Sequence, residues 1–215
     1  MYRLTLIFCL YCLSLFTEEI LTYEKTSGKG SQKIVYTVKK GKEDFLVEIE
    51  GKDLKTTLVA TNPFALKSYI TKKKEDFFEF VLDGSIIKAK GSIQGSALSA
   101  EFKVTKKNPW IQEFDFGLRP LLASSKNSLN FQLINPKNFK IHKMVAKKVQ
   151  KENLKIGTSS YDAQLIEISL QGFKSMFWKA QIWYDTKSYD LLQYKANEGP
   201  NTPLTIVTLV SKIDK

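Results

Sequence analysis

The chain has 215 residues, of which 43% are hydrophobic and 12% aromatic, and its formal net charge at pH 7 is +11. This apolar content is enough for a packed core, so the composition excludes an intrinsically disordered chain. After the N-terminal leader described next, roughly 195 residues remain, the size of one large β domain or two small ones.

Residues 1–22 have the layout of a secretory signal peptide. Arg3 precedes an apolar run, Leu4 to Phe16, and the acidic pair Glu18-Glu19 follows it. The run is about 13 residues long, whereas a membrane-spanning helix needs roughly 20. We therefore expect export, with cleavage at about residues 14–22 and a mature chain, 23–215, that is not transmembrane.

Both cysteines, Cys9 and Cys12, lie inside this leader. The mature chain is therefore expected to contain neither a disulfide nor a thiolate metal site. Bacterial lipoprotein signals carry a small residue before the cysteine, and the bulky Tyr11 precedes Cys12, so lipid anchoring at Cys12 is not favoured. The polar stretch from Glu24 to Lys33 is predicted to be a flexible lead-in.

The following sequence alternates apolar and polar residues with a period of two, which indicates half-buried antiparallel strands. The clearest examples begin at Ile34, Phe45 and Leu98, and the run Phe77–Leu82 ends in Asp83-Gly84, a strong hairpin signal. Helical pattern is scarce. Short helices are predicted at Phe64–Ile70, after Asn62-Pro63, and at Leu118–Ser125.

The last third of the chain is the most apolar. Further strands are predicted at Leu129–Leu133, Phe139–Val149, Leu165–Leu170 and Met176–Tyr184. Leu204–Val210 has apolar residues at both its odd and its even positions, which predicts a strand covered on each face. The fold class is therefore mainly β: a single domain, 23–215, in which a curled antiparallel sheet forms a barrel or half-barrel with one or two short helices. Asn108-Pro109 marks a possible seam near residue 108.

The strongest aromatic cluster lies near residue 180. Trp178, Ile182 and Tyr184 share one face of the predicted strand, and Phe177 and Trp183 share the other. Aromatic residues on both faces are compatible with plain core packing or with a cavity that holds an apolar ligand. The residues interpreted as lining such a cavity are Trp110, Phe177, Trp178, Ile182, Trp183 and Tyr184.

Signals for catalysis or cofactors are weak. The single histidine, His142, is predicted to be a partly exposed strand residue rather than a catalytic base. Two pairs of carboxylates could serve a hydrolase, but Asp185 and Asp190 fit a turn, while Glu113 and Asp115 fit the outward-facing positions of a strand. No catalytic residue, metal site or cofactor is predicted.

The positive charge comes almost wholly from lysine, since Arg3 and Arg119 are the only arginines. A lysine-rich surface is typical of general solubility, or of loose attraction to an anionic membrane surface. Nucleic-acid binding is not expected, because the leader indicates export and the aromatic residues recur at the spacing of core-facing strand positions.

Loosely spaced residues in the second half of the chain, from about residue 83 onward, form a pattern that is similar to that of a known group of proteins. It comprises Asn108-Pro109-Trp110-Ile111-Gln112, Gly117-Leu118, Phe131, Phe177-Trp178, Trp183-Tyr184-Asp185, Leu192-Gln193-Tyr194 and Gly199. With these the chain resembles a group of uncharacterised bacterial exported β-sheet proteins and, more distantly, the curled-sheet lipoprotein carriers of the Gram-negative envelope. The resemblance implies a concave sheet around an apolar cavity, and it carries over no catalytic residue.

Three functional hypotheses follow. The first is an exported protein of the periplasm or cell envelope that binds a lipid or another apolar or amphipathic ligand without catalysis. The second is an envelope scaffold with a solid core and a protein partner, which an exposed apolar patch would favour. The third and least favoured is a hydrolase that uses paired carboxylates.

Overall fold

The computed structural model describes residues 17–28, 30–61, 64–172, 175, 178–197 and 202–215. In these ranges the strands are β1 (Thr17–Ser27), β2 (Gly30–Lys40), β3 (Asp44–Gly51), β4 (Leu54–Thr61), β5 (Ala65–Lys73), β6 (Asp76–Asp83), β7 (Ile86–Ile93), β8 (Ser96–Lys103), β9 (Ser128–Asn135), β10 (Lys140–Ile156), β11 (Ser159–Leu170), β12 (Lys179–Asp185), β13 (Leu191–Asn197) and β14 (Leu204–Asp214). The helices are α1 (Phe114–Gly117) and α2 (Arg119–Ala123).

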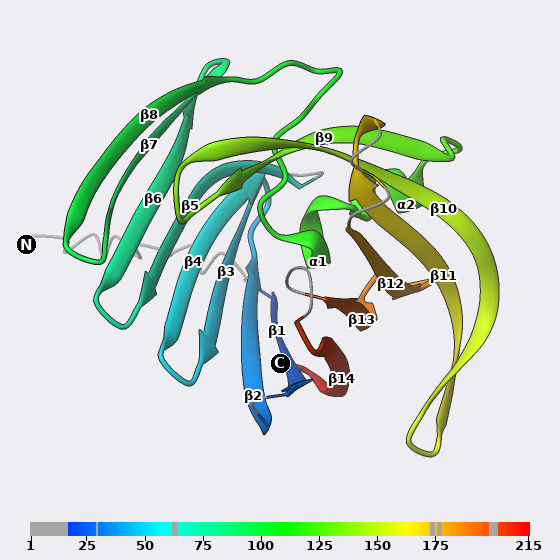
Figure 1. Cartoon of the computed structure of the whole chain (residues 1–215). Coiled ribbons are helices and arrows are strands. Elements are labelled where there is room, and N and C mark those ends of the chain that lie inside the picture. Colours follow the sequence, from blue (N-terminus) through cyan, green and yellow to red (C-terminus); the bar gives the residue numbers. More distant parts are fainter. Residues whose placement is uncertain (1–16, 29, 62–63, 173–174, 176–177, 198–201) are drawn as a thin grey trace, which may run out of the picture.

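All these strands form one antiparallel sheet in the order β8-β7-β6-β5-β4-β3-β2-β1-β14-β13-β12-β11-β10-β9. Strands that are neighbours in sequence pair with each other, except β8 and β9, and the first and last described strands, β1 and β14, also pair. The sheet curls strongly but does not close, and its edges are β8 and β9 (Figure 1). This confirms the predicted curled sheet with few helices and identifies it as open.

The stretch between β8 and β9 carries the chain from one edge of the sheet to the other. It contains Asn108-Pro109, where the seam was predicted, and then α1 and α2, which lie within the curl of the sheet (Figure 1). We call the sheet face toward these helices the inner face. The helix predicted at Leu118–Ser125 is confirmed by α2.

The helix predicted at Phe64–Ile70 is wrong, because these residues belong largely to β5, which pairs with β4 and β6. A helix of about seven residues is marginal in water, whereas a strand between two neighbours satisfies its backbone on both sides. The hairpin predicted at Asp83-Gly84 is confirmed: it joins β6 to β7, and Gly84 has the positive φ of 60° that such a turn requires.

The core consists of two clusters. The larger one fills the inner face between the helices and the central strands, with Tyr23, Phe131 and Ile182 among its fully buried members. The smaller one joins β6 and β7 to the β9–β10 hairpin, where the ring centroids of Phe80 and Phe139 lie 5.4 Å apart. The two arms of the open sheet are thus held together by side chains.

The outer face of β14 is exposed rather than covered, which corrects the prediction for Leu204–Val210. Leu204 is 48% exposed and Val210 is 56% exposed, while Leu209 on the inner face is buried. Strand β14 pairs with β1 on one side and with β13 on the other. Its backbone is therefore hydrogen-bonded within the sheet, without a second layer over its outer face. In the described ranges, none of the helices has the length and apolar character needed to cross a membrane.

Strand β1 begins within the predicted leader. Its residues Glu19 to Thr22 pair with both β2 and β14, and Leu21 is fully buried. The stretch predicted as a flexible lead-in is instead the β1–β2 hairpin, so that prediction is wrong. Polar strand residues looked like a loop because one face of this hairpin is open to solvent.

A chain that begins at Thr17 is expected to fold, whereas one that begins at Tyr23 is expected to lose at least about 3 kcal/mol of unfolding free energy. Loss of a buried leucine alone costs about 2–5 kcal/mol, and the ladder bonds of half a strand are lost with it. Urea unfolding of the two chains measures the difference. Equal stability would show that β1 does not need these residues, while the expected loss would show that the folded sheet depends on them.

Candidate functional site

A buried arginine anchors the two helices inside the sheet. The Arg119 guanidinium lies 3.0 Å from the Asp190 carboxylate and 3.7 Å from Asp115, and all three side chains are almost completely buried. Its carbon Cζ is 4.7 Å from the ring centroid of Phe116 and 5.2 Å from that of Phe64. A planar guanidinium suits both the forked ion pairs and the stacking.

The ion pairs continue from Asp190 across the central strands. Lys212 lies 2.9 Å from Asp190 and 3.6 Å from Glu19, which also pairs with Lys40. On the other side of Arg119, the Tyr23 hydroxyl donates a 2.9 Å hydrogen bond to Asp115. These contacts tie β1, β2 and β14 to the helices, so the network fixes the floor of the inner face.

Two acidic groups beside this arginine bind protons unusually tightly. Burial raises the pKa of Glu113 to about 8, and the nearby Asp115 charge adds to the effect. Burial likewise raises the pKa of Asp115 to about 6, although Arg119 and Tyr23 favour its ionised form. The predicted outward-facing strand for Glu113 and Asp115 is therefore wrong: Phe114 and Asp115 open helix α1, which turns Asp115 into the core.

The two residues of the other carboxylate pair, Asp185 and Asp190, have different roles. Asp185 accepts hydrogen bonds of 2.8 Å from the backbone N–H groups of Lys187 and Ser188, which confirms its predicted place in a turn. Asp190 belongs to the buried network instead. Burial opposes its ionisation, but hydrogen bonds from Lys212 and Ser188 and the charge of Arg119 together hold its pKa below the usual value.

An apolar pocket of about 440 Å³ lies on the inner face beside α1. Strands β9, β10, β11 and β13 supply its walls, and Phe114 of α1 closes one side. The residues that line it are Phe114, Leu133, Asn135, Pro136, His142, Met144, Leu170, Trp178, Tyr194 and Asn197. Its size and its few polar groups are typical of sites that bind small apolar ligands, and we name it the acyl pocket.

Of the residues predicted to line a cavity, Trp178 is in the acyl pocket, where its indole N–H donates a 2.8 Å hydrogen bond to the Asn197 carbonyl. Phe177 lies outside the described residues. Ile182 and Tyr184 are fully buried on the inner face, and the Tyr184 hydroxyl donates to the Phe114 carbonyl at 2.8 Å. They pack beneath α1 rather than line the pocket.

The two other predicted lining residues lie in different surroundings. Trp183 is buried on the face of β12 opposite Ile182, where its indole N–H donates to Glu152 and Lys195 lies 4.9 Å from its ring centroid. Trp110 packs in the smaller core cluster, with its ring centroid 6.1 Å from that of Phe80. The backbone of its segment pairs with β9 through Gln132, which explains why it does not approach β12.

Sequence reasoning missed most of the acyl pocket. Leu133, Met144, Leu170 and Tyr194 were visible as apolar strand residues, but they belong to four strands whose neighbours were unknown. His142 was expected to be partly exposed, and it is half-buried at the pocket beside the Asn135 amide, 3.4 Å away. The alternation of residues along each strand was the available signal, since all of these side chains share one face.

Comparison with known proteins supports the fold. No protein-family model matches the chain, and no curated protein matches it. Among solved structures it is similar to a β-barrel-like protein of domain of unknown function DUF1849 from Brucella abortus, with a TM-score of 0.61 and 10% identity over 93% of this chain and 98% of that one.

Two further structures are less similar. The hypothetical lipoprotein YmcC from Escherichia coli has a TM-score of 0.43 and 14% identity, covering 90% of this chain and 84% of that one. A LolA superfamily protein from Nitrosomonas europaea has a TM-score of 0.24 and 9% identity, covering 92% and 84%. The predicted resemblance to uncharacterised bacterial β-sheet proteins is confirmed at the level of the fold by the Brucella abortus structure.

Proposed function

We propose that this protein is a non-enzymatic binding protein of the bacterial envelope that holds an apolar chain, such as one acyl chain of a lipid, in the acyl pocket. The observation that carries the proposal is the pocket itself. Its volume is about 440 Å³, and it lies beside a core that is otherwise filled by packed side chains.

The lining supports an apolar ligand with a polar end. Leu133, Met144 and Leu170 present aliphatic surface, and Trp178 and Tyr194 add aromatic surface. Burial of such surface contributes about 25 cal/mol per Å². Asn135, His142 and Asn197 supply the few hydrogen-bonding groups, which suits a molecule with a single polar group at one end.

Two observations favour binding over hydrolysis. The carboxylate Asp190 is already paired with Arg119 and Lys212, and Asp115 receives a hydrogen bond from Tyr23. These groups are thus engaged in holding the fold. The predicted leader supports an envelope location, and the fold shared with the Brucella abortus protein is compatible with it.

Filling the acyl pocket is expected to abolish binding of a neutral apolar fluorophore, N-phenyl-1-naphthylamine. The double variant Leu133→Trp/Leu170→Trp places two large rings where the ligand would lie, so its affinity should fall at least about tenfold, or 1.4 kcal/mol. Fluorescence titration of the chain from Thr17 to Lys215 measures this. The matched control is Val149→Trp/Val210→Trp, at two positions that are 55% and 56% exposed.

The control should bind as the unaltered chain does. If the unaltered chain fails to bind the fluorophore, or if both double variants bind it equally well, the acyl pocket is not the site. Trp178→Ala, which removes one wall without filling the pocket, gives a second measurement should the filled variant fail to fold, and it is expected to weaken binding as well.

A further inference from the structure

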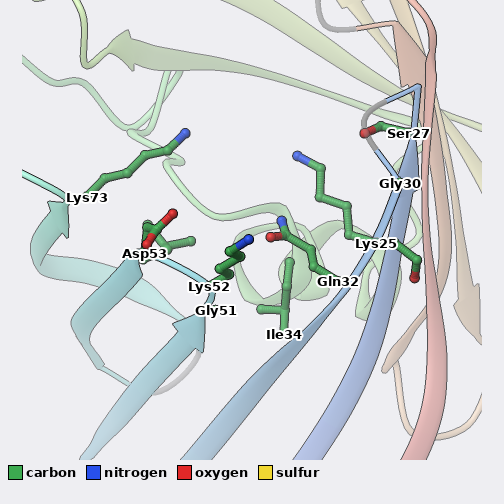
Figure 2. A pocket seen from close by; sticks show the side chains of 11 residues that line it. Lys25, Ser27, Gly30, Gln32, Ile34, Gly51, Lys52, Asp53 and Lys73 are labelled. Carbon is green, nitrogen blue, oxygen red and sulfur yellow. The ribbon is translucent and has the colours of Figure 1, made fainter.

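A second hollow, of about 330 Å³, lies at the rim of the inner face and is rich in lysine (Figure 2). It is formed where the β1–β2 and β3–β4 hairpins and the end of β5 meet. The residues that line it are Lys25, Ser27, Gly30, Ser31, Gln32, Ile34, Gly51, Lys52, Asp53, Leu54 and Lys73. We call it the rim pocket.

The strand register brings the three lysines together. Lys25 is two residues beyond Tyr23, so both share the inner face of β1. Lys73 is two residues beyond Thr71, whose hydroxyl is 2.7 Å from that of Thr56 in the buried interior. Figure 2 shows Lys25 and Lys73 reaching toward each other from opposite walls, with Lys52 between them.

The charges of the rim pocket do not balance. Beside Lys25, the lining has two further lysines, Lys52 and Lys73, and one acid, Asp53, so these last three side chains carry a net charge of one positive unit (2 − 1). Elsewhere strand lysines stand beside carboxylates, as Lys39 does at 2.9 Å from Glu48. Among the described residues, by contrast, neither Lys52 nor Lys73 takes part in an ion pair with Asp53 or any other acid. Like charges that converge on one hollow favour an anion between them.

We propose that the rim pocket binds a phosphate-class oxyanion. Lysine ammonium groups bind phosphate as point charges and can donate three hydrogen bonds each. The Gln32 amide adds a neutral donor, and Ile34 and Leu54 add apolar surface to the lining. The site lies apart from the acyl pocket and shares none of its lining residues.

The oxyanion can belong to a free phosphate or to a lipid headgroup. A neighbouring hollow of about 570 Å³ shares Leu54 and Lys73 with the rim pocket and adds the apolar surfaces of Tyr69, Phe78 and Ile93. A headgroup between the lysines would therefore have apolar surface next to it. Inorganic phosphate and a short-chain phosphatidic acid are the two probes that separate these sources.

The test is isothermal titration calorimetry of the chain from Thr17 to Lys215 with inorganic phosphate, dihexanoylphosphatidic acid and dihexanoylphosphatidylcholine, at low ionic strength, where exposed charges are least screened. Inorganic phosphate, phosphatidic acid or both are expected to bind, and the choline lipid more weakly than the phosphatidic acid. The variant Lys52→Gln/Lys73→Gln should weaken that binding at least tenfold.

The matched control is Lys42→Gln/Lys187→Gln, which removes the same charge at two exposed turn positions away from the rim pocket. It should change the affinity by less than about twofold. Equal affinity for inorganic phosphate and phosphatidic acid identifies free phosphate, and tenfold tighter binding of phosphatidic acid identifies a headgroup; both support the site. No binding of either of these two probes, or an equal loss in the control, would overturn it. Binding of N-phenyl-1-naphthylamine should be unchanged in Lys52→Gln/Lys73→Gln, so failure here is distinguishable from failure of the acyl pocket.

Discussion

Replacing Arg119 with leucine is expected to lower the free energy of unfolding by about 3–5 kcal/mol, because it leaves two buried carboxylates without their shared cation. Asp190 loses its 3.0 Å partner, and Asp115 loses the positive charge that favours its ionised form. The ring contacts of the guanidinium with Phe64 and Phe116 are lost at the same time. For a domain of this size the midpoint of thermal unfolding should fall by about 6–20 °C.

Urea unfolding at pH 7 measures the loss, and Lys187→Leu, a change of an exposed lysine, is the control. Arg119→Lys should recover only part of the stability, since an ammonium keeps the charge but not the planar fork. Adding Asp115→Asn to Arg119→Leu should also recover part of it, because Arg119 is the cation that favours ionised Asp115, whereas Asp190 keeps Lys212. A loss below about 1 kcal/mol for Arg119→Leu would mean that the network does not hold the helices.

Glu113 is expected to make the protein less stable as the pH rises. Its pKa is about 8 in the folded protein against an ordinary value of 4.5, so between these values the folded state holds a proton that the unfolded state has released. The stabilisation is complete below pH 4.5 and is lost as the pH rises through 8. At about 1.4 kcal/mol per pKa unit the effect amounts to several kcal/mol. Asp115, with a pKa of about 6, adds a smaller loss of the same sign.

Glu113→Gln tests this, because glutamine imitates the protonated acid. The variant and the unaltered chain should be similarly stable at pH 4, and the variant should become progressively more stable than the unaltered chain up to pH 8.5. Urea unfolding across this range gives the difference at each pH, and Glu75→Gln, at an exposed position, should show no such trend. A Glu113→Gln effect that does not change with pH would contradict the buried, protonated acid.

Much of the fold was predictable because most of its strands pair with their sequence neighbours. Period-two alternation located many of the strands, though not β1 or β5, and Asp83-Gly84 located a hairpin, since both signals are local. The pairing of β1 with β14 was not predictable, because nothing in either strand specifies a partner almost two hundred residues away. Residues near Glu113 alternate as a strand does, yet Phe114 begins α1, in which Asp115 is buried 3.7 Å from Arg119.

The candidate site was harder to predict than the fold. Trp178 was identified from its aromatic neighbours, but aromatic content does not distinguish a pocket wall from the core beneath α1, where Tyr184 lies. Leu133 and Leu170 line the acyl pocket because their strands flank β10 in the sheet, and that order follows from the whole topology. Arginine is rare in this chain, but the burial of Arg119 could not be predicted, because it depends on Asp190, which is distant in sequence.

The open edges of the sheet determine which contacts would have to break for its two arms to separate. A closed barrel can widen its mouth only by breaking ladder hydrogen bonds, whereas here no ladder joins β8 to β9 in the described ranges. The arms meet instead through rings such as Phe80 and Phe139, whose contacts are non-directional and can slide. Separating the two arms would therefore expose the rings of the smaller core cluster but would break none of the described strand pairings.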